Sequence, residues 1–160
     1  MNCNFDDLAD NARIWIFQSK NKLEEKEEAF INQELTEFTA SWQAHGNDLL
    51  AAHKIYHNRF VIVALDEASY QATGCSIDKL THLVLKMEKE FGLNLLDRMQ
   101  IAFLEDEEVL SLPMSKFKAK IGSEFSKSTM VFNNMIETKA DLFDKWNVEL
   151  KDSWHKQMLS

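Results

Sequence analysis

The longest apolar run in the chain is FVIVAL, at positions 60–65. A continuous run rich in β-branched residues is typical of a strand that is buried on both faces. Asp66 and Glu67 follow this run, and ATGCSID at positions 72–78 then leads into an amphipathic stretch that predicts a helix. The chain is therefore expected to leave a buried strand and enter a helix whose beginning carries a thiol. Such a layout can build a functional site.

A second segment with strand character is ARIWIFQ, at positions 12–18. Ile14 and Ile16 fall on one face of this strand, and Trp15 and Phe17 fall on the other. Because both faces are apolar, this strand is also expected to lie in the middle of a sheet.

Two further strands have mixed patterns. The alternation at 49–57 is typical of a sheet edge, and His57-Asn58 predicts a tight turn into the run at 60–65, because Asn tolerates the left-handed conformation. The segment 99–103 predicts a strand with one buried face.

Two long helices are expected. The first follows Asn21, which stands three residues before Glu24 in the spacing of a capping box, and it is expected to end at Gly46. The second is expected to end at Gly92, a natural C-cap. Its apolar face consists of Ile77, Leu80, Val84, Met87 and Phe91.

The order β-α-β-β-α-β predicts an α+β fold with a ferredoxin-like core, and another α+β order of the same elements is the alternative. In that core the first and third strands lie in the middle of the sheet, in agreement with their apolar patterns. A C-terminal extension should add short helices near 116–121 and 139–146 and one extra strand at 129–136. This extension, or a homodimer contact, would cover the second apolar face of the sheet.

The chain of 160 residues has neither a linker nor an internal repeat, so we expect residues 1–160 to form a single globular domain. Its 18 basic and 26 acidic residues give a formal charge of −8, which disfavours nucleic acid and anionic membranes as partners. No export signal and no membrane-spanning apolar run are found in the sequence. Two cysteines far apart do not make a disulfide framework, and a reduced, cytoplasmic protein is expected.

Cys75 is the most prominent candidate for chemistry. It precedes Ser76, an expected N-cap, and Asp78. The unpaired amides at a helix N-terminus favour the thiolate form, which would make Cys75 a nucleophile or a redox-responsive thiol. The alternative is that Cys75 packs the loop as a small apolar residue, with Ser76 and Asp78 serving only as caps.

Metal and nucleotide sites are not predicted. His53 and His57 share a strand face but lie roughly 13 Å apart at the spacing of a strand, too far to hold one ion. A metal site would need distant residues to converge, such as His45, Asp66, Glu67 and His155. The glycines form neither a Walker A motif nor a dinucleotide-binding motif, so no cofactor is expected.

Motifs along nearly the whole chain resemble a family of small uncharacterised bacterial proteins, some of which carry the label "ABC transporter ATPase". They are NARIW at 11–15, Trp42 with AHG at 44–46, RF at 59–60, DE at 66–67, ATGCSID at 72–78, LDRM at 96–99, FNN at 132–134 and SWH at 153–155. The resemblance implies that polar residues of these motifs belong together, but it implies no activity. The ATPase label lacks support, because Walker A is absent and 160 residues are too few for a transporter nucleotide-binding domain.

The interpretation that we favour is a module without ATPase activity that binds a small molecule or dimerises through the second sheet face. The alternative is an enzyme in which Cys75 is the nucleophile and His45 or His155 is the base. An ATPase-associated protein is a weaker alternative that rests on the label alone. The expected ligand contacts are Asp66, Ser76, Asn133, Asn134 and Trp154. Tying the C-terminus and a strand end to the core is the plainer role for Asn133, Asn134, Trp154 and His155.

Overall fold

The computed structural model describes Met1 and residues 3–159 and shows a mixed α+β protein with three antiparallel sheets in that part of the chain. The chain divides into two compact units. The first contains Met1–Leu96 with Glu137–Lys139, and the second contains the remaining described residues. The expectation of a single folding domain stays a prediction.

The first unit contains a three-stranded sheet with the order β1 (Arg13–Gln18), β5 (Phe60–Asp66), β4 (Leu50–Tyr56). The prediction that the run at 60–65 is a central buried strand is confirmed, because none of its six side chains is exposed. The edge position of β4 and the turn that follows it are also confirmed. His57 and Asn58 both have positive φ angles, of 55° and 52°.

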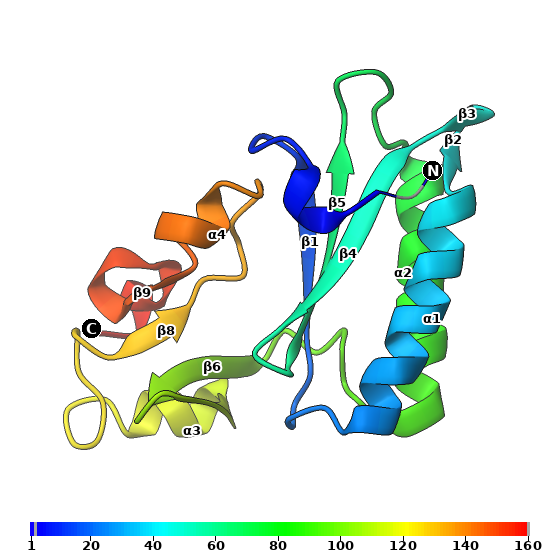
Figure 1. Ribbon diagram of the computed structural model, residues 1–160. Helices are drawn as coiled ribbons and strands as arrows, with labels where there is room; N and C mark the ends of the chain where they lie inside the picture. The colour runs from blue at the N-terminus through cyan, green and yellow to red at the C-terminus, as the bar shows by residue number, and fades with distance from the viewer. Residues whose placement is uncertain (2, 160) are drawn as a thin grey trace. The chain divides into compact units, whose positions relative to one another are not determined.

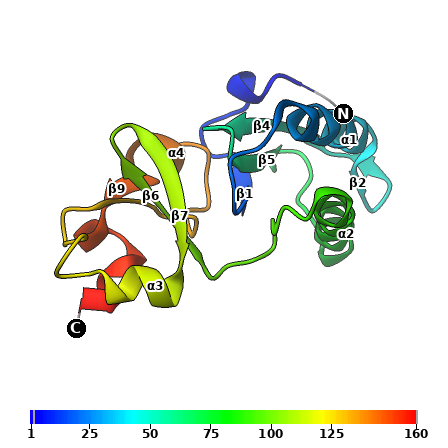
Figure 2. The ribbon, with the colours of Figure 1, turned by 90° about the horizontal axis from the view of Figure 1, so that it is seen from below.

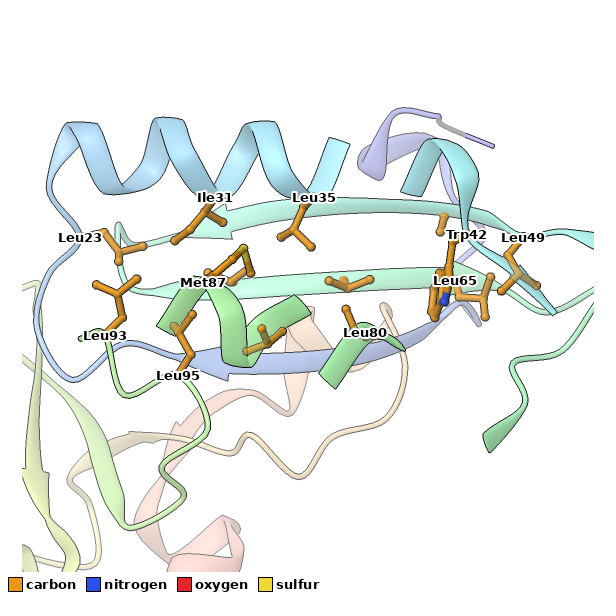
Figure 3. Close-up of a cluster of buried hydrophobic side chains, with 14 of the residues drawn as sticks. Leu23, Ile31, Leu35, Trp42, Leu49, Leu65, Leu80, Met87, Leu93 and Leu95 are labelled. Carbon is orange, nitrogen blue, oxygen red and sulfur yellow. The ribbon is translucent and has the colours of Figure 1, made fainter. Parts of the chain in front are cut away.

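Two long helices, α1 (Glu25–Ser41) and α2 (Gly74–Phe91), lie side by side on the same face of this sheet (Figures 1 and 2). Ile31 and Leu35 of α1 and Leu80 and Met87 of α2 meet in the core cluster of the unit, which also contains β-strand residues such as Leu65 (Figure 3). This burial of apolar area is the main favourable term that holds the helices on the sheet.

The predicted helix ends need correction. The capping box of α1 joins Glu24 to Glu27, not Asn21 to Glu24, and the helix ends at Ser41, before the expected Gly46. A short hairpin of β2 (Gln43–Ala44) and β3 (Asn47–Asp48) occupies the difference. Its turn residues His45 and Gly46 both have positive φ, so a helix could not have continued to Gly46.

The start of α2 also differs from the expectation. The N-cap is Thr73, and Ser76 is the third helical residue of a capping box, in which the Ser76 hydroxyl accepts a hydrogen bond from the Thr73 amide at 2.7 Å. Cys75 is therefore the second residue of the helix. The predicted C-cap is confirmed, because Gly92 has a φ of 65°.

The ferredoxin-like arrangement is not confirmed. β1 lies at the edge of the sheet next to β5, and on its other side the described residues form an isolated bridge between Arg13 and Thr138 instead of a further strand. The expected fourth strand, β6 (Gln100–Glu105), belongs to a different sheet. Both edges of β6 are occupied in that sheet: β7 (Glu108–Pro113) pairs with it through a two-residue hairpin, which costs little loop-closure entropy, and β8 (Met130–Phe132) pairs on its other side.

The second unit contains a four-stranded sheet with the order β7-β6-β8-β9. The predicted extension is recognisable, but its elements are shorter: α3 (Met114–Ala119), β8 (Met130–Phe132) and α4 (Asp141–Asp144). The strand β9 (Asn147–Glu149) was not predicted. Three aromatic side chains fill the core, with ring centroids 4.5 to 5.8 Å apart: Phe103, Phe117 and Phe125.

The face of the first sheet that points away from α1 and α2 carries Ile14, Ile62 and Ala64, and all three are buried. On the same unit a short 3-10 helix, η1 (Phe5–Asp7), buries Phe5, which packs edge-on against Tyr56 at 6.0 Å. A homodimer through this second face stays a prediction.

Candidate functional site

The predicted site residues of the first unit serve mainly local structure. Ser76 is buried in its capping box, and its main-chain oxygen accepts a hydrogen bond from the Trp42 indole at 2.9 Å. Asp66 accepts a hydrogen bond from the amide of Ala68 at 2.9 Å, which fixes the turn after β5. Cys75 is exposed on the first turn of α2, and His45 is exposed on the β2–β3 turn. The helix and the hairpin contact each other, but each side chain faces solvent.

His155, in the second unit, is buried with 1% of its surface exposed. Its Nδ1 lies 2.6 Å from the Ser153 hydroxyl, and its ring stacks on Trp154 with centroids 4.0 Å apart. Burial lowers the pKa of His155 to about 4, so the ring is neutral at pH 7. This histidine packs the C-terminal 3-10 segment and is not exposed to a substrate.

The two asparagines that were expected to contact a ligand also make structural hydrogen bonds. Asn133 accepts one from the amide of Met135 at 3.0 Å, and Asn134 accepts one from the Trp146 indole at 2.9 Å. The predicted site residues thus divide between the two units, four in each: Cys75, His45, Asp66 and Ser76 in the first, and His155, Asn133, Asn134 and Trp154 in the second.

A hollow that sequence reasoning did not single out lies in the first unit, at the free edge of β4. Its volume is about 480 Å³, and we refer to it as the edge hollow. Three segments supply the lining: the N-terminal segment with Cys3, Asn4, Phe5 and Asp6, helix α1 with Thr36 and Thr39, and strand β4 with Ala52, His53 and Lys54.

The described residues of the N-terminal segment are held against β4 by hydrogen bonds and an ion pair. The amide of Ala51 donates a hydrogen bond to the carbonyl of Met1 at 3.3 Å, and the Cys3 thiol donates one to the carbonyl of Ala51 at 3.6 Å. Asp6 forms an ion pair with Lys54 at 2.9 Å. One wall of the edge hollow is therefore a segment that lies where a further strand would pair.

Strand alternation indicates what the edge offers a ligand. Since the main-chain N–H of Ala51 points away from β5, the main-chain N–H and C=O of His53, two residues further on, point toward the same free edge. An edge strand with outward donors and acceptors is a template for an added extended segment. The edge hollow therefore combines main-chain and side-chain hydrogen-bonding groups.

The side chains of the edge hollow have defined charge states. Burial is the largest cause that raises the pKa of the Cys3 thiol, so this sulfur is a neutral thiol at pH 7. Burial lowers the pKa of His53, which favours the neutral ring, and its Nε2 lies 2.9 Å from the Asn32 amide oxygen. The hydrogen bond to Asp6 raises the pKa of Lys54, which stays an ammonium group.

These states favour binding over covalent chemistry. A nucleophilic thiol needs a lowered pKa or an adjacent base, whereas the Cys3 thiol is held in its protonated form.

Thr39 is buried and donates its hydroxyl to the Leu35 carbonyl at 2.9 Å, while Thr36 is exposed at the mouth of the hollow. The arrangement can recognise a polar molecule through hydrogen bonds and charges of both signs.

Comparison of the chain with protein-family models, with curated proteins and with solved structures gave no match. In the described part of the chain, no helix is both long and apolar enough to span a membrane. Among the same residues, no group of three histidine, cysteine or acidic side chains is placed to hold a metal ion.

Proposed function

We propose that the protein is a non-catalytic module that binds a small polar molecule in the edge hollow and has no ATPase activity. The hollow itself carries the proposal, because its 480 Å³ falls within the size range of small-molecule sites and it lies at the outer edge of β4, where no further strand pairs in the described part of the chain. The ferredoxin-like relationship and the bacterial family are not needed for this proposal.

The chemistry of the lining favours a ligand with an amide group and the size of an amino acid or a dipeptide. An amide can donate to and accept from the main chain of His53, in the manner of an added strand. Lys54 and Asp6 provide one positive and one negative group, and Phe5 provides an apolar surface. A free phosphate or a nucleotide fits less well, because the Asp6 carboxylate beside Lys54 repels an anion.

The thiol-based enzyme with Cys75 remains the alternative. Its support is the exposure of Cys75 on the first turn of a long helix. Two observations weigh against it: His155 is buried against Trp154, and His45 lies on an exposed turn without a hydrogen bond that would orient it as a base in the described residues.

The test is a thermal-shift and calorimetry screen with free amino acids, dipeptides and N-acetyl amino-acid amides, alongside ATP and divalent metals. A ligand at a hundredfold its dissociation constant should add about 2.7 kcal/mol to the free energy of unfolding. We expect stabilisation by the dipeptides and the N-acetyl amino-acid amides, and neither stabilisation by ATP nor phosphate release from it.

A blocking variant assigns the site. Thr36→Trp places an indole at the mouth of the edge hollow from an exposed helix position and should remove the stabilisation. Thr81→Trp makes the same substitution at an exposed position of α2 that does not line the hollow, and it should bind as the wild type does. The proposal fails if no member of the series binds, or if the two variants bind equally well.

A further inference from the structure

We propose that the protein self-associates head to tail, with Phe143 of one copy seated in a groove on α2 of a second copy. Phe143 is the most exposed large apolar residue among those described, with 96% of its surface accessible. It lies in α4, a single helical turn that is followed by the buried Trp146. A fully exposed phenylalanine ring keeps its apolar area in water, and burying that ring against another surface would be favourable.

The partner surface is a groove of about 490 Å³ on the outer stripe of α2, which we call the α2 groove. Its lining residues are spaced at i, i+3, i+4, i+7 and i+8: His82, Leu85, Lys86, Lys89 and Glu90. Leu85 is partly exposed there, and the lysine side chains add apolar methylene stems below their ammonium heads. An aromatic ring fits such a surface, since lysine ammonium groups also attract aromatic faces.

Charge complementarity selects a second copy as the occupant. Phe143 is flanked by Asp141 and Asp144, whereas the α2 groove is flanked by Lys86 and Lys89. Asp141 pairs with Lys145 at 3.6 Å, and Lys86 pairs with Glu34 at 3.6 Å.

The remaining two charges have no such partner: within the part of the chain that the structure describes, neither Asp144 nor Lys89 forms an ion pair. Seating Phe143 in the α2 groove of another molecule would bring this carboxylate and this ammonium group together. Glu90 is the one acidic residue in the lining of the α2 groove. Its charge disfavours a different partner that would place many acidic side chains against this groove.

The contact uses different surfaces on the two copies, so it is heterologous and leaves one Phe143 and one α2 groove free in each dimer. It is small, and we expect a weak equilibrium that is populated at protein concentrations approaching about 1 mM. This contact does not involve the second sheet face, which carries Ile14, Ile62 and Ala64.

Sedimentation velocity over a concentration series tests the proposal with the full chain. The wild type should show mass-average sedimentation that rises with concentration. Phe143→Ala and the double variant Leu85→Asn/Lys89→Glu should each weaken self-association at least about tenfold, as expected for the centre of an interface. Met99→Ala removes another exposed apolar side chain and should behave as the wild type.

Mixing the two interface variants gives the sharper result. Phe143→Ala keeps its α2 groove and the double variant keeps its Phe143, so an equimolar mixture should form a one-to-one dimer that cannot grow further. In the charge-reversed chain Asp144→Lys/Lys89→Asp, the self-association lost in either single reversal should return. The proposal is overturned if the wild type stays monomeric at about 1 mM, a concentration that populates weak contacts, if Phe143→Ala associates as the wild type does, or if the mixture remains monomeric.

Discussion

In the first unit the core lies between a sheet and two helices of 17 and 18 residues, whereas in the second unit it lies among strands of three to six residues and short helical turns. The first core consists mainly of aliphatic side chains from long elements, with Trp42 and further aromatic rings packed at its margin, whereas the second core has packed phenylalanine rings such as Phe103 and Phe117 among aliphatic side chains. A long element spreads its stabilisation over many side chains. The second unit concentrates its stabilisation in a few side chains. This difference determines which substitutions should lower the free energy of unfolding most.

The largest effect is expected in the aromatic core. Phe117→Ala removes a ring that is 0% exposed and packs on both Phe103 and Phe125, and it should lower the free energy of unfolding by about 3 to 5 kcal/mol. Leu35→Ala in the first unit should cost about 2 to 5 kcal/mol and less than the phenylalanine change. Urea denaturation of both variants measures the difference. A smaller loss for Phe117→Ala than for Leu35→Ala would contradict this contrast.

The second effect is a pH dependence from His155. Its pKa is lowered from 6.5 in the unfolded reference to about 4 in the folded chain, so folding favours the neutral ring. The stabilisation is therefore complete above about pH 6.5 and is lost as pH falls toward 4, by about 2 to 3 kcal/mol. Urea denaturation at several pH values, compared with His155→Gln, isolates this contribution from those of the carboxylates. Equal slopes for the two proteins would show that His155 titrates normally.

The two cysteines, both in the first unit, should differ in reactivity. Cys75 is exposed, while Cys3 is partly buried and has a raised pKa, so a disulfide reagent at about pH 8 should label Cys75 at least about tenfold faster. Cys3→Ser and Cys75→Ser assign the two phases. If Cys75 also reacts faster than a free model thiol, the enzyme alternative gains support, and if it reacts no faster, that alternative loses its nucleophile.

The smallest effect concerns two hairpin turns, one in each unit. The turn in the first unit uses Asn58, a residue that tolerates its positive φ, but the turn in the second unit holds Glu107 at a φ of 66°. Glu107→Gly should raise the free energy of unfolding by about 0.5 to 1 kcal/mol, whereas Asn58→Gly should change it by less. A destabilising Glu107→Gly would show that this side chain makes a contribution beyond its backbone strain.

These same turns show what the sequence could and could not predict. Asn58 after an alternating strand is a recognised turn signal, and the hairpin it closes was predicted. The turn Asp106-Glu107, which lies between the paired residues Glu105 and Glu108, carries no such signal, so β7 was not predicted. Without β7, nothing in the sequence indicated that β6 belongs to a second sheet. The strand at 60–65 was predicted because six consecutive apolar residues are typical of a strand that is buried on both faces.

The candidate site was less predictable for a related reason. Cys75 and Ser76 stand out in the sequence, yet their signal comes from the caps of α2. The edge hollow depends on a tertiary contact that brings Cys3 and Asp6 to β4, nearly fifty residues away. The sequence signals available for this site were the polar N-terminal segment and the pair His53 and Lys54 on an edge strand. No spacing pattern in the sequence indicates that these two segments come together.

The central claim is that the first unit binds an amide-containing molecule where its N-terminal segment meets β4. The most direct measurement is a ¹H–¹⁵N NMR titration with an N-acetyl amino-acid amide from the screen. The predicted result is a set of saturable shifts confined to Cys3, Asp6, Thr36, His53 and their neighbours, which Thr36→Trp abolishes and Thr81→Trp leaves intact. Shifts centred elsewhere, or a spectrum unchanged at saturating ligand, would contradict the account.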